Sequence, residues 1–139
     1  MDGKECFQVF PIGFVRSVLK ERRGAPRQGW EGAPDADLEI APDFTLALDG
    51  LSARQEIWVL TWLHQSQRSV LKVHPRDDTT NPETGVFATR SADRPNPIGL
   101  HRVSVLKVEG NRLTVRPLEA IEGTPILDIK PVLEQIDLF

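Results

Sequence analysis

The segment from residue 85 to residue 100, GVFATRSADRPNPIGL, combines several polar side chains with a stiff stretch of backbone. Arg90 and Ser91 follow a predicted strand, and Asn96 stands between two prolines. Proline fixes φ and has no N–H, and the residue before it is held extended. Gly99 permits a close approach of another group or a positive φ. The segment is either a preorganised ligand cradle or a tight connection between barrel strands closed by an internal Arg–Asp pair.

Two further segments carry side chains that could bind a ligand. Glu119 and Glu122 lie beside the turn at Gly123-Thr124-Pro125, and two carboxylates near a turn could hold a ribose diol or a cation. Pro26-Arg27-Gln28 lies in an early loop rich in glycine, proline and arginine. Both segments could equally be exposed surface, because loops normally run over the outside of a protein.

Several common catalytic motifs are missing from the sequence. No GxGxxG follows a strand, and there is no Walker A loop, HExxH helix or GxSxG elbow. His64, His74 and His101 are scattered, which favours separate structural roles over a metal trio. Cys6 is the only cysteine, so neither an intrachain disulfide nor a cysteine-based zinc site can form. We therefore expect no metal and a reducing compartment.

The elements that must position these residues are predicted to be short strands. Alternating apolar and β-branched residues predict strands over 7–18, 38–40, 56–64, 70–74, 85–89, 101–108, 112–116 and 126–129. Gly110-Asn111 is a hairpin signal, and Phe44–Ala53 predicts a short helical or turn segment. The sum is an all-β fold, a small single-sheet β-barrel with one or two short helices.

Length and charge limit the possible functions. The chain has 139 residues, and we expect residues 1–139 to form a single domain. Its net charge of −3 differs from the basic charge typical of nucleic-acid modules. A local basic patch is nevertheless present, either as a binding face or as a solvated loop, and it consists of Arg16, Lys20, Arg22, Arg23 and Arg27. Neither a signal peptide nor a membrane span is recognisable, so we expect a cytoplasmic protein that does not bind a membrane.

Taken together, these segments resemble the TsaA-like domain family. The resemblance rests on GVFATRSxxRPNPIGL and EGTPILDIKP, with PIGFVRS and GAPRQG near the start, and runs from about Pro11 to Pro131. The characterised members are tRNA methyltransferases that act on N6-threonylcarbamoyladenosine beside the anticodon. The resemblance implies a β-barrel homodimer that binds S-adenosylmethionine near the subunit interface and methylates N6 of a modified adenosine in tRNA. Binding of tRNA would require a positive face, for which the candidates are Arg16, Lys20, Arg22, Arg23, Arg27, Arg90 and Arg94.

The resemblance also implies a cofactor site, carried over position by position. Its residues are Pro26, Arg27, Gln28, His64, Gln65, Arg90, Leu100, Glu119, Ala120, Ile121 and Glu122. Carboxylates suit a sulfonium cation and ribose hydroxyls, and an arginine suits the methionine carboxylate or a substrate phosphate. Because the N6 proton must leave, a basic group is also needed, and the choice among the candidates stays open. The candidate catalytic residues are His64, Arg90, Glu119 and Glu122.

Three departures from the family pattern bear on the substrate. The family usually has aspartate where Glu119 and Glu122 stand, and tyrosine where Val132 stands. The characterised bacterial enzymes continue into a C-terminal domain that helps to engage tRNA, whereas we expect the barrel alone in a chain that ends at Phe139. Two alternatives follow, namely a methyltransferase for a small molecule or another RNA, and a protein that binds S-adenosylmethionine without transferring the methyl group.

Overall fold

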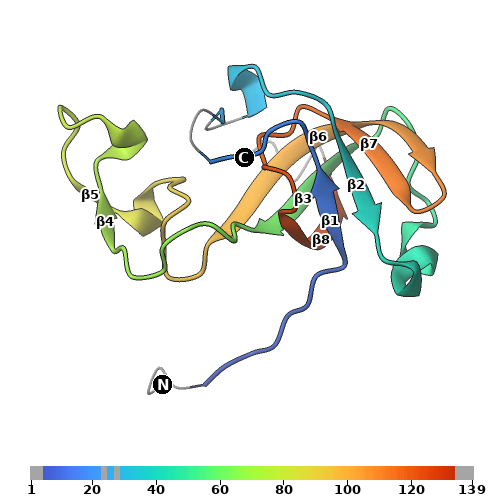
Figure 1. Ribbon diagram of the computed structural model, residues 1–139, viewed down its shortest axis with the longest axis horizontal. Helices are drawn as coiled ribbons and strands as arrows, with labels where there is room; N and C mark the ends of the chain where they lie inside the picture. Colours follow the sequence, from blue (N-terminus) through green and yellow to red (C-terminus); the bar gives the residue numbers. More distant parts are fainter. Residues whose placement is uncertain (1–4, 23–24, 27–28, 134–139) are drawn as a thin grey trace.

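Six antiparallel strands close into a barrel in the computed structural model, which describes residues 5–22, 25–26 and 29–133 (Figure 1). The strands are β1 (Gly13–Arg16), β2 (Ala36–Ile40), β3 (Glu56–Trp62), β6 (Ile98–Glu109), β7 (Arg112–Arg116) and β8 (Pro125–Pro131). Their order around the barrel is β1-β2-β7-β6-β3-β8, and β8 returns to pair with β1. The predicted all-β barrel is therefore confirmed.

The connection from β3 to β6 runs out from the barrel and returns to it beside the end of β3. It carries β4 (Lys72–Val73) and β5 (Thr84–Gly85), which pair as a separate two-stranded sheet. Figure 1 shows this sheet well away from the barrel. Where the excursion closes, the Leu63 N–H donates to the Pro97 carbonyl at 2.8 Å.

Helical structure in the described ranges is limited to 3₁₀ segments. These are η1 (Gly29–Glu31), η2 (Pro42–Leu48), η3 (Pro75–Asp77) and η4 (Val86–Ala88). Only η2 is longer than three residues among those described, and it overlaps the predicted helical segment at Phe44–Ala53. None of these helices has the length and apolarity to cross a membrane.

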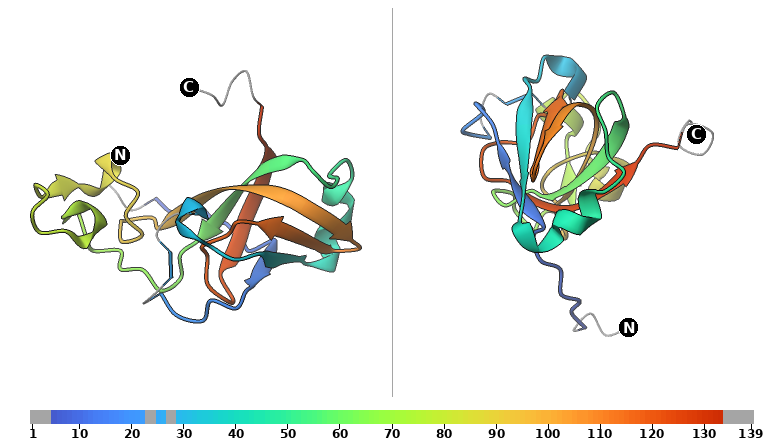
Figure 2. Two further views of the ribbon diagram at one scale, coloured as in Figure 1. Left: turned by 90° about the horizontal axis from the view of Figure 1, so that it is seen from above. Right: turned by 90° about the vertical axis from the view of Figure 1, so that its right-hand side faces the viewer.

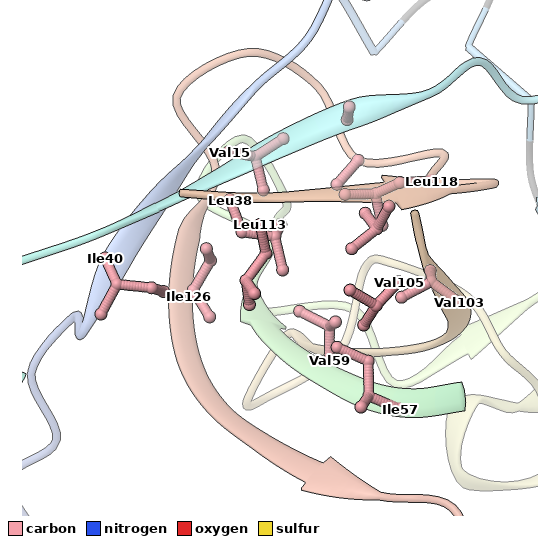
Figure 3. Close-up of a cluster of buried hydrophobic side chains, with 13 residues drawn as sticks. Val15, Leu38, Ile40, Ile57, Val59, Val103, Val105, Leu113, Leu118 and Ile126 are labelled. Carbon is pink, nitrogen blue, oxygen red and sulfur yellow. The ribbon is translucent and has the colours of Figure 1, made fainter. Parts of the chain in front are cut away.

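The core consists of the inward-facing side chains of the barrel strands. In β3, Ile57, Val59 and Thr61 are fully buried while their neighbours are partly exposed, which is the period of two that a strand requires. Figure 3 shows side chains from β1, β2, β3, β6, β7 and β8 converging on the same interior, and the view along the barrel in Figure 2 shows the strands enclosing it. The alternation in the sequence therefore correctly predicts a strand from residue 56, although the strand ends at Trp62 and not at residue 64.

Of the predicted strands, only that over 112–116 has the predicted bounds, and the strands predicted over 85–89 and 7–18 are mostly not formed. Residues 85–89 do not continue as a strand, because the Thr89 N–H and hydroxyl both bond back to the Val86 carbonyl at 3.0 Å and close the turn of η4. The predicted strand over 7–18 pairs with β2 only from Gly13 onward. Before that point, the ring of Phe10 stacks on Phe44 with centroids 5.9 Å apart.

The register brings three connections to the same end of the barrel. β3 ends opposite the start of β6 at the Trp62–Ile98 pair, β8 starts beside the end of β1, and β2 starts beside the end of β7. Alternate connections of an antiparallel sheet share an end, because each strand reverses the chain direction. We call this the site end, and its connections are 17–35, 63–97 and 117–124.

The seam between β1 and β8 is the shortest ladder that closes the barrel. It has two register pairs, Gly13–Ile126 and Phe14–Pro125, whereas the ladder between β3 and β6 has seven. Gly13 also passes close to β2, since a Cβ there would lie 2.2 Å from the Glu39 carbonyl oxygen.

Candidate functional site

The connection after β1 is joined to the signature segment, residues 85–100, by an ion pair. The two terminal guanidinium nitrogens of Arg22, Nη1 and Nη2, each lie 2.8 Å from a carboxylate oxygen of Asp93. Asp93 also accepts the backbone N–H of Gln67 at 2.9 Å, and Arg22 Nη1 lies 3.5 Å from the Gln65 carbonyl. This arrangement, which we call the Arg22 clamp, links the early loop, the turn after β3 and the signature segment.

The acidic turn, residues 119–122, is fastened to the same early connection. The Glu122 N–H donates to the Leu19 carbonyl at 2.6 Å. Just before the turn, the Leu118 N–H donates to the Pro34 carbonyl at 3.0 Å. The early connection therefore bonds to the acidic turn and, through the Arg22 clamp, to the signature segment.

The carboxylate of Glu122 is held by groups of the protein itself. It accepts the Lys20 ammonium at 3.2 Å and the Ser17 N–H at 3.1 Å, and Arg16 Nη1 lies 4.0 Å away. The Lys20 hydrogen bond, followed by that from Ser17, holds the pKa of Glu122 below its ordinary value. Both oxygens are therefore engaged, which leaves Glu122 poorly placed for the ribose contact that the sequence suggests.

Glu119 makes a different contact, with the interior of the barrel. Its Oε1 lies 2.5 Å from Nδ1 of His101, and Nε2 of His101 lies 2.7 Å from Oγ1 of Thr61. Thr61 and His101 are 0% and 5% exposed, and the side chain of Glu119 is 13% exposed. In the described part of the chain, Oε2 of Glu119 has no hydrogen-bond partner. Glu119 is therefore the carboxylate of the acidic turn that can still accept a hydrogen bond from a ligand.

The remaining predicted residues lie in different connections of the site end. Pro26 is half-buried, His64 and Gln65 are exposed in the turn after β3, and Arg90 is exposed beyond η4. Ala120 is buried together with Ile121 in the acidic turn, so these two would meet a ligand through their backbone. Two predicted residues, Arg27 and Gln28, lie outside the described residues.

Leu100 is not brought together with Glu119. Burial alternates along β6, with Gly99 and His101 inside the barrel and Leu100 40% exposed on the outer face. Successive side chains of a strand point to opposite faces. Leu100 therefore lies on the other side of the sheet from the His101–Glu119 pair.

The predicted positive face is largely neutralised. Arg16, Lys20 and Arg22 each form an ion pair with a carboxylate. Arg94 donates to the backbone carbonyls of the η4 turn. Of the described candidates, Arg90 alone has no ion-pair or hydrogen-bond partner within the described residues. Two further candidates, Arg23 and Arg27, lie outside those residues.

His101, Thr61 and Asp93 are not among the site residues predicted from the sequence. A signal for His101 was present, since alternation places it on the same face as Val103, and a buried imidazole must be hydrogen-bonded. Asp93 does form an Arg–Asp pair, but with Arg22, 71 positions away, rather than within its own loop. In the ranges that the structure describes, no group of three or more His, Cys, Asp or Glu side chains is arranged to hold a metal ion.

The Arg22 clamp should contribute stability that disappears in acid. Hydrogen bonding to Arg22, assisted by the Gln67 N–H, holds the pKa of Asp93 below its ordinary value of 3.8. A carboxyl group with a lowered folded-state pKa stabilises the fold above its unfolded pKa, and this contribution is lost as the pH falls through the folded pKa. We expect Asp93→Asn to lower the free energy of unfolding by about 1 kcal/mol at neutral pH.

Denaturant melts of the wild type and Asp93→Asn between about pH 7 and pH 2 measure this difference. The difference in unfolding free energy between the two proteins should be constant down to about pH 5 and should shrink as the pH falls through the folded-state pKa of Asp93. A gap of the same size at both extremes would contradict the assignment.

Comparison with known proteins identifies the family. Residues 14–138 match the family described as the tRNA-methyltransferase O N-terminal domain, and the chain belongs to this family. It is 44% identical over 130 residues to a Methanothermobacter thermautotrophicus protein named "Probable S-adenosyl-L-methionine-binding protein", covering 94% of this chain and 93% of that protein. It is 42% identical over 127 residues to the "S-adenosyl-L-methionine-binding protein" of Archaeoglobus fulgidus, covering 91% and 90%.

A solved structure agrees with this assignment. TrmO from Pseudomonas aeruginosa matches with a TM-score of 0.79 at 34% identity, over 97% of this chain and 60% of that chain. The chain thus spans about three fifths of the length of the TrmO structure. The resemblance drawn from the signature segment is confirmed, and the predicted cofactor and enzyme class agree with the names of these relatives.

Proposed function

We propose that this protein transfers the methyl group of S-adenosylmethionine to N6 of a modified adenosine in tRNA, with the cofactor bound at the site end of the barrel. The observation that supports this most is the convergence of three separate connections there, each of which carries predicted cofactor residues. The Arg22 clamp and the backbone bonds of the acidic turn hold these connections against one another. Family membership supports the reaction class.

In this proposal, the residues of the site end bind and orient rather than react covalently. Glu119 accepts a ribose hydroxyl or attracts the sulfonium cation through its unengaged Oε2. Arg90, exposed beyond η4, binds the methionine carboxylate or a substrate phosphate. S-adenosylmethionine supplies an electrophilic methyl group, and in-line displacement by N6 depends mainly on positioning. His64 is exposed in the turn after β3 and can receive the N6 proton.

We also propose that the active form is a homodimer and that it works in the cytoplasm. The outer face of β6 exposes Ile98, Leu100 and Leu106 by 44%, 40% and 37%. Ile98 and Leu100 are neighbours on this face, whereas Arg102 and Ser104 separate them from Leu106. Neighbouring exposed apolar side chains of this kind are suited to contact with a partner. Light scattering should give the mass of two chains at micromolar concentration, and a monomer would contradict the proposal.

Calorimetry followed by a transfer assay tests the function. The protein is titrated with S-adenosylmethionine and with S-adenosylhomocysteine, and is then incubated with methyl-labelled cofactor and tRNA that lacks the N6 methyl group. Binding of both nucleosides with label transferred to tRNA is the expected result. Absence of binding to either compound would overturn the proposal.

A second candidate is binding of S-adenosylmethionine without transfer to tRNA. It is favoured by the ion pairs that neutralise Arg16, Lys20 and Arg22, which leave little free positive charge for phosphates. Affinity for tRNA that falls steeply with added salt supports the tRNA enzyme, because displaced counterions give that dependence. Cofactor binding without any salt-sensitive tRNA affinity supports the second candidate.

Arg90→Ala should remove cofactor or substrate binding and leave the fold intact. The side chain is exposed and has no partner among the described residues, so its loss leaves no buried group unpaired. We expect the dissociation constant or the KM to rise at least about tenfold, with the free energy of unfolding changed by less than about 0.5 kcal/mol. An unchanged affinity and rate would refute the role given to Arg90.

A further inference from the structure

The hydrogen-bonded chain Thr61–His101–Glu119 is unusual within this barrel, where most interior side chains are aliphatic. Each link is within hydrogen-bond distance, at 2.7 Å and 2.5 Å. A carboxylate only accepts, so Nδ1 of His101 must carry the proton that Glu119 receives. In the tautomer protonated at Nδ1, Nε2 accepts the Thr61 hydroxyl, so every polar atom of the imidazole has a partner.

The backbone makes room for this chain. A Cβ at Gly99 would lie 2.4 Å from Oγ1 of Thr61 and 2.7 Å from Nε2 of His101. The imidazole therefore stands in space that only a glycine leaves open. Because buried polar groups are costly without partners, the packing around Gly99 and Thr61 fixes the ring and with it the direction of Nδ1–H.

Glu119 is the member of the hydrogen-bonded chain Thr61–His101–Glu119 that is exposed to solvent. Glu119 keeps 13% of its side chain exposed, whereas the side chain of His101 keeps 4%. Oε1 is engaged by the imidazole, and Oε2 has no partner in the described ranges. A carboxylate oxygen accepts hydrogen bonds, so Oε2 is suited to a hydroxyl donor or a cation and not to an anion.

We infer that His101, supported by Thr61, is a positioning residue that holds the Glu119 carboxylate in the orientation needed for S-adenosylmethionine. This inference rests on the proposed function, since it takes Glu119 as a cofactor contact. A glutamate side chain has three rotatable bonds, and fixing it before the ligand arrives removes part of the entropy lost on binding. His101 thus acts through Glu119 and does not itself touch the cofactor.

Two replacements of His101 separate positioning from packing. The side-chain amide of Asn reaches the position of Nδ1, so His101→Asn retains a donor to Glu119 but loses the contact with Thr61. The amide of Gln reaches the position of Nε2, so His101→Gln retains a partner for Thr61 but releases Glu119. Each variant loses one hydrogen bond of the chain, and we expect similar decreases in denaturation midpoint.

Their affinities for S-adenosylmethionine should differ. By calorimetry, His101→Asn should stay within about threefold of the wild type, while His101→Gln should bind at least about tenfold more weakly. In the wild type, ¹⁵N NMR of His101 should show the tautomer protonated at Nδ1. Equal affinities for the two variants, or a tautomer protonated at Nε2, would overturn the inference while the wild type still binds the cofactor. A wild type that binds no S-adenosylmethionine would overturn the proposed function, and this inference with it.

Discussion

Gly99→Ala is expected to lower the free energy of unfolding by about 1–3 kcal/mol and to weaken cofactor binding at the same time. The added methyl group would lie 2.4 Å from Oγ1 of Thr61 and 2.7 Å from Nε2 of His101. Both side chains are buried and bonded to each other, so neither can swing into solvent. The methyl group must push the imidazole of His101 away from Thr61, and this displacement also moves Nδ1 out of line with Glu119.

Chemical denaturation and calorimetry with S-adenosylmethionine measure the two effects. Gly85→Ala is a matched control from the same signature segment, since a Cβ there meets nothing within 4 Å and its φ is −59°. We expect that control to retain wild-type stability within about 0.5 kcal/mol. Equal losses in the two variants would show that the crowding at Gly99 is not the cause.

Glu119→Gln is expected to weaken binding of S-adenosylmethionine at least about tenfold, with a smaller effect on stability. The replacement keeps the length and shape of the side chain, and the amide oxygen can still accept Nδ1–H of His101. The change falls at the position of Oε2, where the NH₂ group of the amide, a donor, replaces a charged acceptor oxygen. A ribose hydroxyl then loses its acceptor, and a sulfonium cation loses the opposite charge.

Glu122→Gln provides the counterpart within the same acidic turn. Its carboxylate already accepts Lys20 and Ser17, so we expect it to alter affinity by less than about threefold. Calorimetry on both variants at one salt concentration makes the comparison. If Glu122→Gln lost more affinity than Glu119→Gln, the roles of the two carboxylates would have to be exchanged.

The sequence predicts the barrel well where strands are half-buried. Residues 112–116 are observed as predicted, because alternation of apolar and polar residues in this stretch matches the burial of a strand with one face inside. The same alternation wrongly predicts a strand over residues 85–89, where the hydroxyl of Thr89 helps to close a turn. Local bonding by threonine competes with a ladder, and the pattern of hydrophobicity does not register that competition.

The segments of the site were predictable, but their contacts were not. The resemblance identifies which stretches belong to the site, and the register brings those stretches to one end. The Arg22–Asp93 pair spans 71 positions, and the pairing of His101 with Glu119 depends on how β6 lies against the acidic turn. Such contacts follow from three-dimensional packing, and neither spacing nor composition specifies them.

Because the ladder between β1 and β8 is short, a ligand bound beside it can stabilise the whole barrel. Two register pairs close the sheet there, and the acidic turn and the early connection meet directly beside them. Any molecule that contacts both segments ties together the two strands whose separation would open the barrel. Occupancy then adds to the free energy of closure by mass action, as RT ln(1 + [L]/Kd). The free energy of unfolding would thereby rise with the concentration of the cofactor.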